Sequence, residues 1–325
     1  MVIEIKNLTK SFKIYRKEEG FFSTIRSFFK RDFVNVEAVK NISLSIKAGE
    51  KVGFLGPNGA GKSTTIKMMT GILYPSSGEV NILGYTPFKN RKKYVKNIGV
   101  IFGQKSQLWI DLPAIDAFSL HKDIYNISDD DFKKRVSFLT KKLNIKEVVK
   151  RPVRNLSLGE RMKCEFAIAL LHNPPVLFLD EPTIGVDALS KDEIRSFLSD
   201  VNKEFKTTFI LTTHDMDDIE EVCDRIIVID KGNIIYDGNL KNLKKKYVKW
   251  TLIKIDFSKV KNKKKFEELQ KKGEVLVDGN NYKEIKFSKK QNINNILNEL
   301  MKSVEVVDLS IQEPRLESVI KEIYK

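Results

Sequence analysis

The sequence of 325 residues is long enough for one large domain and a smaller one. Hydrophobic residues make up 41% and charged residues 31%, which is typical of a globular protein, and no apolar run approaches the roughly 18 residues that span a bilayer. The net charge is +15, but the lysines are spread along the chain without the interleaved aromatic residues or glycines of a nucleic-acid platform, so we expect no nucleic-acid partner.

The basic residues favour a solvated surface, with attraction to an anionic membrane or an acidic partner as the alternative. The first residues, MVIEIKNLTK, lack the layout of a signal peptide, so we expect a cytosolic chain. Cys164 and Cys223 have no CxxC partner and no histidine cluster. We interpret both as reduced core residues rather than metal ligands or redox groups.

Alternating segments at residues 3–7, 42–47 and 79–83 predict strands of a small antiparallel sheet. An insertion at about residues 16–34 separates the first two segments and contains an aromatic stripe at helical spacing. The stripe consists of Phe21, Phe22, Ile25, Phe28 and Phe29. It indicates either a buried core or a contact with a membrane face or membrane partner.

Nearly continuous apolar runs at 51–55, 176–180, 208–213 and 225–230 predict central parallel strands covered on both faces. Residues 106–160 are rich in charge and helical periodicity and predict an inserted helical subdomain. After about residue 240 the pattern changes to strand, helix, two strands, helix and strand, which predicts a small ferredoxin-like unit closed by a last helix at 314–324.

The first apolar run leads into GPNGAGKST, in the strand, loop and helix setting of a phosphate-binding loop. Its three glycines let the loop turn its N–H groups inward, Lys62 would reach the outer phosphates, and the hydroxyl of Ser63 suits Mg²⁺. The predicted nucleotide-binding residues of this loop are Gly56, Pro57, Asn58, Gly59, Ala60, Gly61, Lys62, Ser63 and Thr64.

A second anion site is predicted at NLSLGER, where Ser157 and Gly159 stand at the start of a helix. A pair of acids follows in VLFLDEPT, at the carboxyl end of a buried strand. We interpret Asp180 as the acid on the Mg²⁺ side and Glu181 as the group that polarises an attacking water. The alternative is that both acids cap the following turn.

These motifs, in this order, resemble the nucleotide-binding subunit of an ATP-binding cassette (ABC) transporter over roughly residues 1–240. GPNGAGKST is similar to the family's Walker A motif, VLFLDEP to its Walker B motif with the catalytic glutamate, and NLSLGER to its signature motif. In IFGQKSQLW, TIGVDALS and TTHDMDD the resemblance implies a Q-loop glutamine at Gln104, a D-loop aspartate at Asp187 and a switch histidine at His214.

The implied fold is α/β: a P-loop cassette with a mainly parallel sheet, an antiparallel N-terminal subdomain and a helical insert, followed by an α+β domain at 241–325. The resemblance implies that two cassettes pack head to tail, so that Ser157 and Gly159 face the ATP held by the other Walker A motif. Gln104 would touch the Mg²⁺ or the water and His214 the γ-phosphate. Phe12, or else Tyr15, would stack on adenine.

One departure is that Leu158 and Glu160 stand where the usual signature, LSGGQ, has glycine and glutamine. The resemblance implies an ATPase with ATP and Mg²⁺ as ligands, acting as a homodimer or beside a similar cassette. It would drive a separate membrane permease, as in bacterial drug or polymer exporters, from the cytoplasmic face of the membrane. The alternative, a soluble ABC ATPase acting on a ribosome or nucleic acid, is disfavoured by the single unbroken cassette without sustained heptads.

Overall fold

The computed structural model describes all residues of the chain except 16–32, 104, 248, 313–315 and 325. The chain divides into two compact units, Met1–Gly238 and Asn239–Lys325. Among the helices that the structure describes, none is both long and apolar enough to cross a membrane.

A six-stranded sheet forms the centre of the first unit, in the order β5-β6-β7-β3-β8-β9. Its strands are β3 (Lys51–Leu55), β5 (Ile98–Phe102), β6 (Val176–Asp180), β7 (Thr208–Thr212), β8 (Arg225–Asp230) and β9 (Asn233–Asn239). The pairs β5–β6, β6–β7, β3–β7 and β3–β8 are parallel, which confirms the prediction from the four apolar runs. The carboxyl ends of β3, β6 and β7 therefore lie at one edge of the sheet.

Strands β5 and β9 were not predicted by the sequence pattern. Strand β5 contains Gly99, and glycine weakens a strand signal. A Cβ atom at this position would stand 2.7 Å from the carbonyl oxygen of Ala169, so the glycine lets a helix approach the sheet closely. Strand β9 lies at the sheet edge and alternates between exposed and half-buried residues, so it has no continuous apolar run.

The predicted antiparallel sheet is confirmed, in the order β2-β1-β4. Its strands are β1 (Ile3–Tyr15), β2 (Phe33–Ile46) and β4 (Ser77–Ile82). The first two are longer than predicted because their pairing continues past Leu8, through shifts in register, as far as Tyr15 opposite Phe33. Residues 16–32 thus connect two paired strands, and the aromatic stripe lies outside the described residues.

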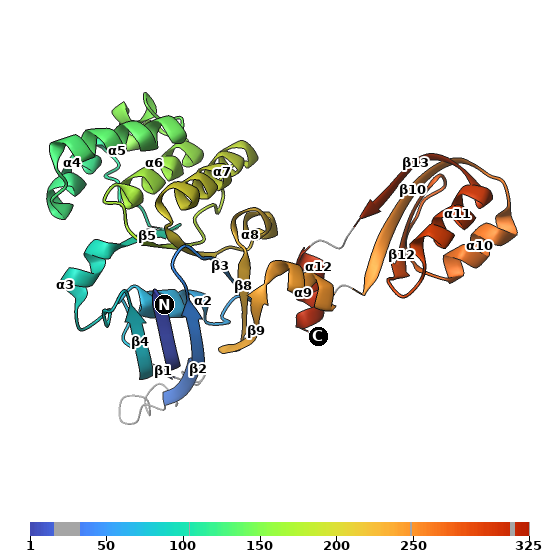
Figure 1. Cartoon of the computed structure of the whole chain (residues 1–325), viewed down its shortest axis with the longest axis horizontal. Helices are drawn as coiled ribbons and strands as arrows, with labels where there is room; N and C mark the ends of the chain where they lie inside the picture. The colour runs from blue at the N-terminus through green and yellow to red at the C-terminus, as the bar shows by residue number, and fades with distance from the viewer. Residues whose placement is uncertain (16–32, 104, 248, 313–315, 325) are drawn as a thin grey trace, which may run out of the picture. The chain divides into compact units, whose positions relative to one another are not determined.

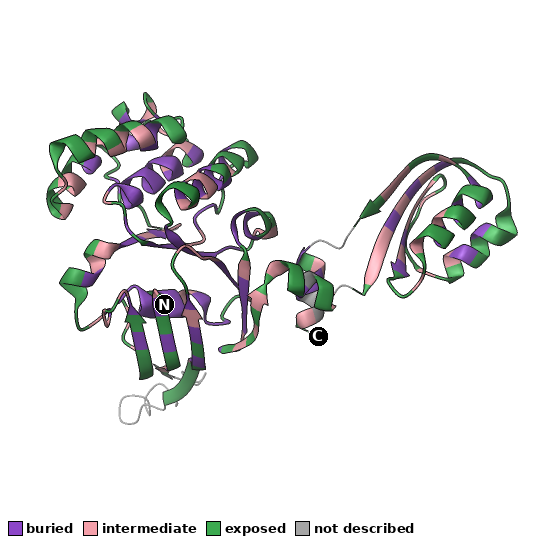
Figure 2. Cartoon of the chain, viewed as in Figure 1, coloured by how far each residue is buried: buried purple, intermediate pink, exposed green. Residues whose placement is uncertain are grey.

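Helices of the first unit lie around the six-stranded sheet and in a further group beyond it (Figure 1). They are α2 (Lys62–Met69), α3 (Arg91–Tyr94), α4 (Ala114–Tyr125), α5 (Asp129–Lys142), α6 (Leu158–Leu170), α7 (Ala188–Phe205) and α8 (Met216–Val222), with 3₁₀ turns η1 (Val95–Asn97), η2 (Val148–Lys150) and η3 (Val153–Asn155). Helix α2 lies between the two sheets, where Ile66 and Met69 join the core cluster of Ile3 and Phe54. Helix α6 is buried from Met162 to the end of the helix, as Figure 2 shows.

The second unit contains a four-stranded antiparallel sheet in the order β11-β12-β10-β13. Its elements are β10 (Trp250–Val260), α10 (Lys263–Lys271), β11 (Glu274–Asp278), β12 (Tyr282–Ser288), α11 (Ile293–Ser303) and β13 (Val304–Gln312). This is the element order of the ferredoxin-like motif. Ile253, Ile285, Phe266 and Leu300 belong to its core. Two further helices, α9 (Leu240–Tyr247) and α12 (Leu316–Ile323), contact each other.

Candidate functional site

The loop between β3 and α2 is closed on one side by the antiparallel sheet. Gly61 precedes α2 with a φ of 108° in the left-handed region. A Cβ atom there would stand 2.4 Å from the carbonyl oxygen of Ala38 on β2, so only glycine fits. The amide of Gly232 also donates to the carbonyl oxygen of Ala60 at 3.0 Å. The loop is therefore held from both β2 and the turn after β8.

Lys62, the first residue of α2, folds back over this loop. Its Nζ donates to the carbonyl oxygens of Gly56 and Pro57, at 2.6 and 3.1 Å, and the residue is 6% exposed. Burial lowers the pKa of Lys62, and the charges of Glu181 and Asp180 partly oppose that shift. A buried ammonium held by carbonyl oxygens is a strong site for an anion such as a phosphate chain.

Asp180 ends β6 and joins it to two neighbouring elements. Its Oδ1 accepts hydrogen bonds from Ser63 Oγ on α2, at 3.0 Å, and from Thr212 Oγ1 at the end of β7, at 2.6 Å. The hydroxyl of Ser63 and the carboxylate of Asp180 are both oxygen donors of the kind that Mg²⁺ prefers. The described residues therefore fit a Mg²⁺ ion at this position.

Glu181 and His214 form a second pair beside the first. His214 Nε2 lies 2.6 Å from Glu181 Oε1, with the histidine side chain 49% exposed and the glutamate 22%. Glu181 has a φ of 54°, and its amide donates to the carbonyl oxygen of Thr212 at 2.9 Å. The two adjacent acids take different partners, since Glu181 pairs with His214 and Asp180 accepts from Ser63 and Thr212.

These groups surround a cavity of about 680 Å³. Its described lining consists of Asn58, Gly59, Ser63, Lys67, Ile72, Phe102, Gly103, Lys105, Asp180, Glu181, Ile184 and His214. The loop, the paired acids and the histidine thus face one space. Such a set can bind a polyphosphate, hold a divalent cation and orient a water molecule.

The predicted signature and D-loop residues form a separate group. Ser157 begins α6 in a capping box: its Oγ accepts from the Glu160 amide at 3.1 Å, and its own amide donates to Glu160 Oε2 at 2.9 Å. Burial disfavours the charge on Glu160, but these bonds and an ion pair with Arg151 outweigh it and lower its pKa. Glutamate at position 160 is therefore explained as half of a cap.

Gly159 brings the start of α6 against the start of α7. A Cβ atom at Gly159 would stand 2.2 Å from Ser190 Oγ and 2.9 Å from Asp187 Oδ2. Asp187 caps α7 by accepting from the Ser190 amide at 2.9 Å, which lowers its pKa. Ser157 and Asp187 are both exposed, and neither is among the described residues that line the 680 Å³ cavity.

Two further predicted positions, Phe12 and Gln104, are not placed at the cavity by the described residues. Phe12 lies on β1, opposite Val36, with Lys10 Nζ 5.2 Å from its ring centre, and it is not among the described lining residues. Gln104 lies outside the described residues, although its neighbours Gly103 and Lys105 line the cavity. Adenine stacking by Phe12 and the role of Gln104 therefore stay predictions.

Sequence reasoning missed Thr212, which donates directly to Asp180. Its position at the end of an apolar run was a usable signal, because parallel strand ends meet at one edge. It also missed Lys67 and Lys105 at the cavity wall. Their charges belong to a surface on which lysine is common, so nothing in the local pattern marks them.

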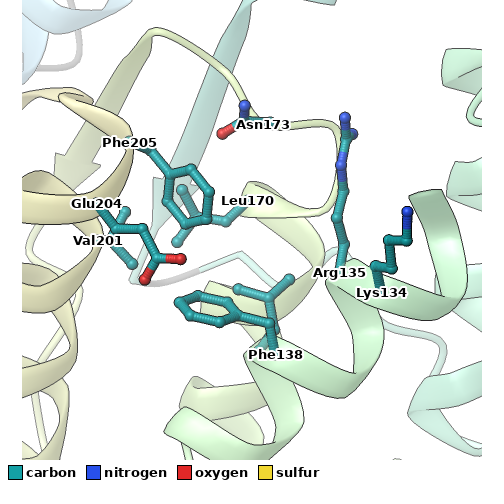
Figure 3. A pocket seen from close by; sticks show the side chains of 9 residues that line it. Lys134, Arg135, Phe138, Leu170, Asn173, Val201, Glu204 and Phe205 are labelled. Atoms are coloured by element: carbon teal, nitrogen blue, oxygen red, sulfur yellow. The ribbon is translucent and has the colours of Figure 1, made fainter.

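A second cavity, of about 220 Å³, lies between the helical insert and α7 (Figure 3). It is lined by Lys134, Arg135, Phe138, Leu139, Leu170, Asn173, Val201, Glu204 and Phe205. The rings of Phe138 and Phe205 meet edge to face, 5.4 Å apart. None of these lining residues belongs to a motif.

Comparison with known proteins gives a consistent result. The family model described as "ABC transporter" matches residues 39–184. The chain is 35% identical over 208 residues to the ABC transporter ATP-binding protein NatA of Bacillus subtilis (strain 168), covering 64% of this chain and 84% of NatA. It is 35% identical over 214 residues to the linearmycin resistance ATP-binding protein LnrL of the same organism, covering 66% of this chain and 68% of LnrL.

Solved structures show the same cassette. The chain is similar to the ATP-binding cassette MJ0796, solved as a dimer in a post-hydrolysis state bound to ADP and Pi, with a TM-score of 0.60 and 27% identity over 73% of this chain and 98% of that one. It is also similar to cbiO1 from Clostridium perfringens, part of the ABC transporter complex cbiONQ, with a TM-score of 0.60 and 29% identity over 75% of this chain and 93% of that one. The chain therefore belongs to the ABC transporter family, as one of its ATP-binding, ATP-hydrolysing cassettes.

Proposed function

We propose that this cassette dimerises head to tail around two Mg-ATP molecules and drives a separate membrane permease, as the motor of an exporter. The observation that carries the proposal is the division of the site into two groups. Ser63, Asp180, Glu181 and His214 line one cavity, whereas the exposed start of α6 with Ser157 is not among its described lining. A second chain would supply that helix start to the nucleotide.

Within one chain the proposed roles follow from the contacts. Lys62 and the glycine loop bind the phosphates, with the ammonium already turned toward the loop. Ser63 and Asp180 would hold Mg²⁺, which would neutralise phosphate charge, and the Thr212 hydroxyl orients the Asp180 carboxylate. Glu181 orients the attacking water, and His214 fixes the Glu181 side chain and reaches the γ-phosphate.

Between two chains, the α6 start of the partner would complete the site. The unpaired N–H groups there and the Ser157 hydroxyl favour an anion. The capping bond uses Ser157 Oγ as an acceptor and leaves the hydroxyl proton as a separate donor. ATP would thus hold two chains together, and loss of the γ-phosphate would release them. Asp187 and Gln104 would line the same interface and the hinge of the helical insert.

The membrane part of the proposal rests on relatives. NatA is named as an ABC transporter ATP-binding protein, and LnrL as a linearmycin resistance ATP-binding protein. We infer that residues 1–240 are the ATPase domain and residues 241–325 an accessory domain. The cassette would work at the cytoplasmic face of the membrane, attached through its permease.

Co-purification tests this function. The tagged chain would be expressed in its native cell, and membranes would be solubilised gently in Mg-ATP before mass spectrometry. We expect one or two multi-span membrane proteins at a stoichiometric level. The matched control for ATP-dependent recovery is Lys62→Ala, which we expect to weaken nucleotide binding. Recovery of ribosomes or nucleic acid without a membrane protein would contradict the proposal.

A further inference from the structure

A single buried carboxylate on α8 contacts both loops that carry Glu181 and His214. Asp218 is 2% exposed. Its Oδ2 accepts hydrogen bonds from Thr183 Oγ1 at 2.5 Å and from Thr213 Oγ1 at 3.1 Å. The two threonines come from different segments of the chain, one after β6 and one after β7. Asp218 therefore joins those segments.

Each threonine adjoins one member of the Glu181–His214 pair. Thr183 lies two residues after Glu181, and Thr213 immediately precedes His214. The Thr213 hydroxyl also accepts from the amide of Asp215, at 3.0 Å. This one hydroxyl thus fixes the backbone on both sides of His214.

The orientation of the Asp218 carboxylate is set from its other side. Arg195 on α7 is 9% exposed, and its Nε donates to Asp218 Oδ1 at 2.7 Å. The guanidinium is itself held by Asp192, Glu221 and Asp215, at 3.0, 3.4 and 3.6 Å. Asp215 is further paired with Lys191 at 2.6 Å. Both oxygens of Asp218 are therefore engaged, and the carboxylate has little freedom to rotate.

The pair that these contacts hold needs such support. Glu181 has a φ of 54°, a region that a residue with a Cβ atom occupies only when its surroundings impose it. The contact of 2.6 Å between Glu181 Oε1 and His214 Nε2 also requires the two loops to keep a fixed separation. A hydrogen-bonded bridge between Thr183 and Thr213 supplies that separation.

We propose that Asp218 is a positioning residue for ATP hydrolysis, which acts through Thr183 and Thr213 to keep Glu181 and His214 in contact. Asp218 is buried and both of its carboxylate oxygens are engaged by Thr183, Thr213 and Arg195, so it acts through these contacts. The inference rests on the proposed role of Glu181 as the residue that orients the attacking water.

The test compares Asp218→Asn with Asp217→Asn, the same chemical change at an exposed neighbour on the same helix. We expect Asp218→Asn to lower kcat about a hundredfold, the scale of a small misplacement of a reacting group, with the Kd for Mg-ATP within about twofold of wild type. Asp217→Asn should leave both unchanged. Thr183→Val is the second variant, because it removes one hydrogen bond and keeps the ion pair with Arg195; it should lower kcat about tenfold with the Kd unchanged.

A double mutant separates positioning from general damage. In a Glu181→Gln background no catalytic carboxylate remains to be positioned, so Asp218→Asn should lower the residual single-turnover rate no further. Equal kcat values for Asp218→Asn, Thr183→Val and Asp217→Asn, or a full additional loss in the Glu181→Gln background, would overturn the inference. If Glu181→Gln hydrolysed ATP at the wild-type rate, that result would instead contradict the proposed role of Glu181.

Discussion

At the scale of single residues, Lys62 carries the charge that the phosphates would meet. Its ammonium is buried and donates to two carbonyl oxygens of its own loop. Burial lowers its pKa below the usual 10.5 of a lysine, while Glu181 and Asp180 act in the opposite direction. A bound phosphate chain would add negative charge and raise the pKa again.

This pKa shift predicts the pH dependence of nucleotide binding. Only the protonated form of Lys62 attracts phosphate, and its pKa is lowered in the free protein. The affinity for Mg-ATP should therefore fall as pH rises from 7.5 towards 10, beginning below the titration range of an ordinary lysine, and binding there should take up a proton. Titration calorimetry in buffers of different ionisation enthalpy measures both effects.

Lys62→Arg is the control, because a guanidinium stays protonated throughout this range. The slope of affinity against pH should flatten in that variant even if its affinity at pH 7.5 is lower. If the affinity of the wild-type protein for Mg-ATP stayed constant between about pH 7.5 and 10, Lys62 would not be the group that sets the pH dependence of binding.

At the scale of elements, the starts of α6 and α7 are packed as one unit. The absence of a side chain at Gly159 lets the two helix starts approach, with Ser190 and Asp187 next to it. Because Ser157 caps α6 and Asp187 caps α7, this contact sets the position of both predicted interface residues.

Gly159→Ala should push these two helix starts apart. The added Cβ would stand 2.2 Å from Ser190 Oγ, and such overpacking costs about 1–3 kcal/mol. We expect steady-state ATP hydrolysis to fall at least about tenfold while single-chain Mg-ATP binding persists, since the 680 Å³ cavity is not touched. Hydrolysis rates and fluorescent nucleotide titrations measure the two effects.

The rescue variant Gly159→Ala with Ser190→Gly removes the nearest clashing side chain, and Ser190→Gly alone is its control. The double variant should recover part of the lost hydrolysis. A Gly159→Ala chain that hydrolyses ATP at the wild-type rate would show that the contact between α6 and α7 does not matter for activity.

The elements also show what sequence can and cannot predict. Continuous apolar runs identified β3, β6, β7 and β8, because strands buried on both faces have no polar alternation. Strand β5 was missed because Gly99 interrupts its apolar run. The glycine leaves room for the close approach of the helix that contains Ala169. The loop from Gly56 to Thr64 was predictable because its residues are contiguous in sequence.

The network of Asp218 could not be predicted in this way. Its partners Thr183 and Arg195 lie 35 and 23 positions away along the chain. No local pattern distinguishes these residues from ordinary loop or surface residues, and only the fold brings them together. The same holds for Thr212 beside Asp180, 32 positions apart.

At the scale of the whole molecule, the two halves of the proposed nucleotide site lie apart within one chain. The cavity lined by Asp180 and Glu181 would be one half, and the exposed start of α6 with Ser157 would be the other. Hydrolysis would therefore require two chains, and nucleotide binding only one.

The most direct test of this central claim is the mass of the Glu181→Gln variant in Mg-ATP, measured by sedimentation equilibrium. Without the water-orienting carboxylate, ATP should stay intact and hold two chains together. We predict twice the mass of one chain with Mg-ATP and the mass of one chain without nucleotide. Adding Ser157→Phe should return the mass to one chain while ATP still binds. A Glu181→Gln chain that binds Mg-ATP and keeps the mass of one chain would contradict the account.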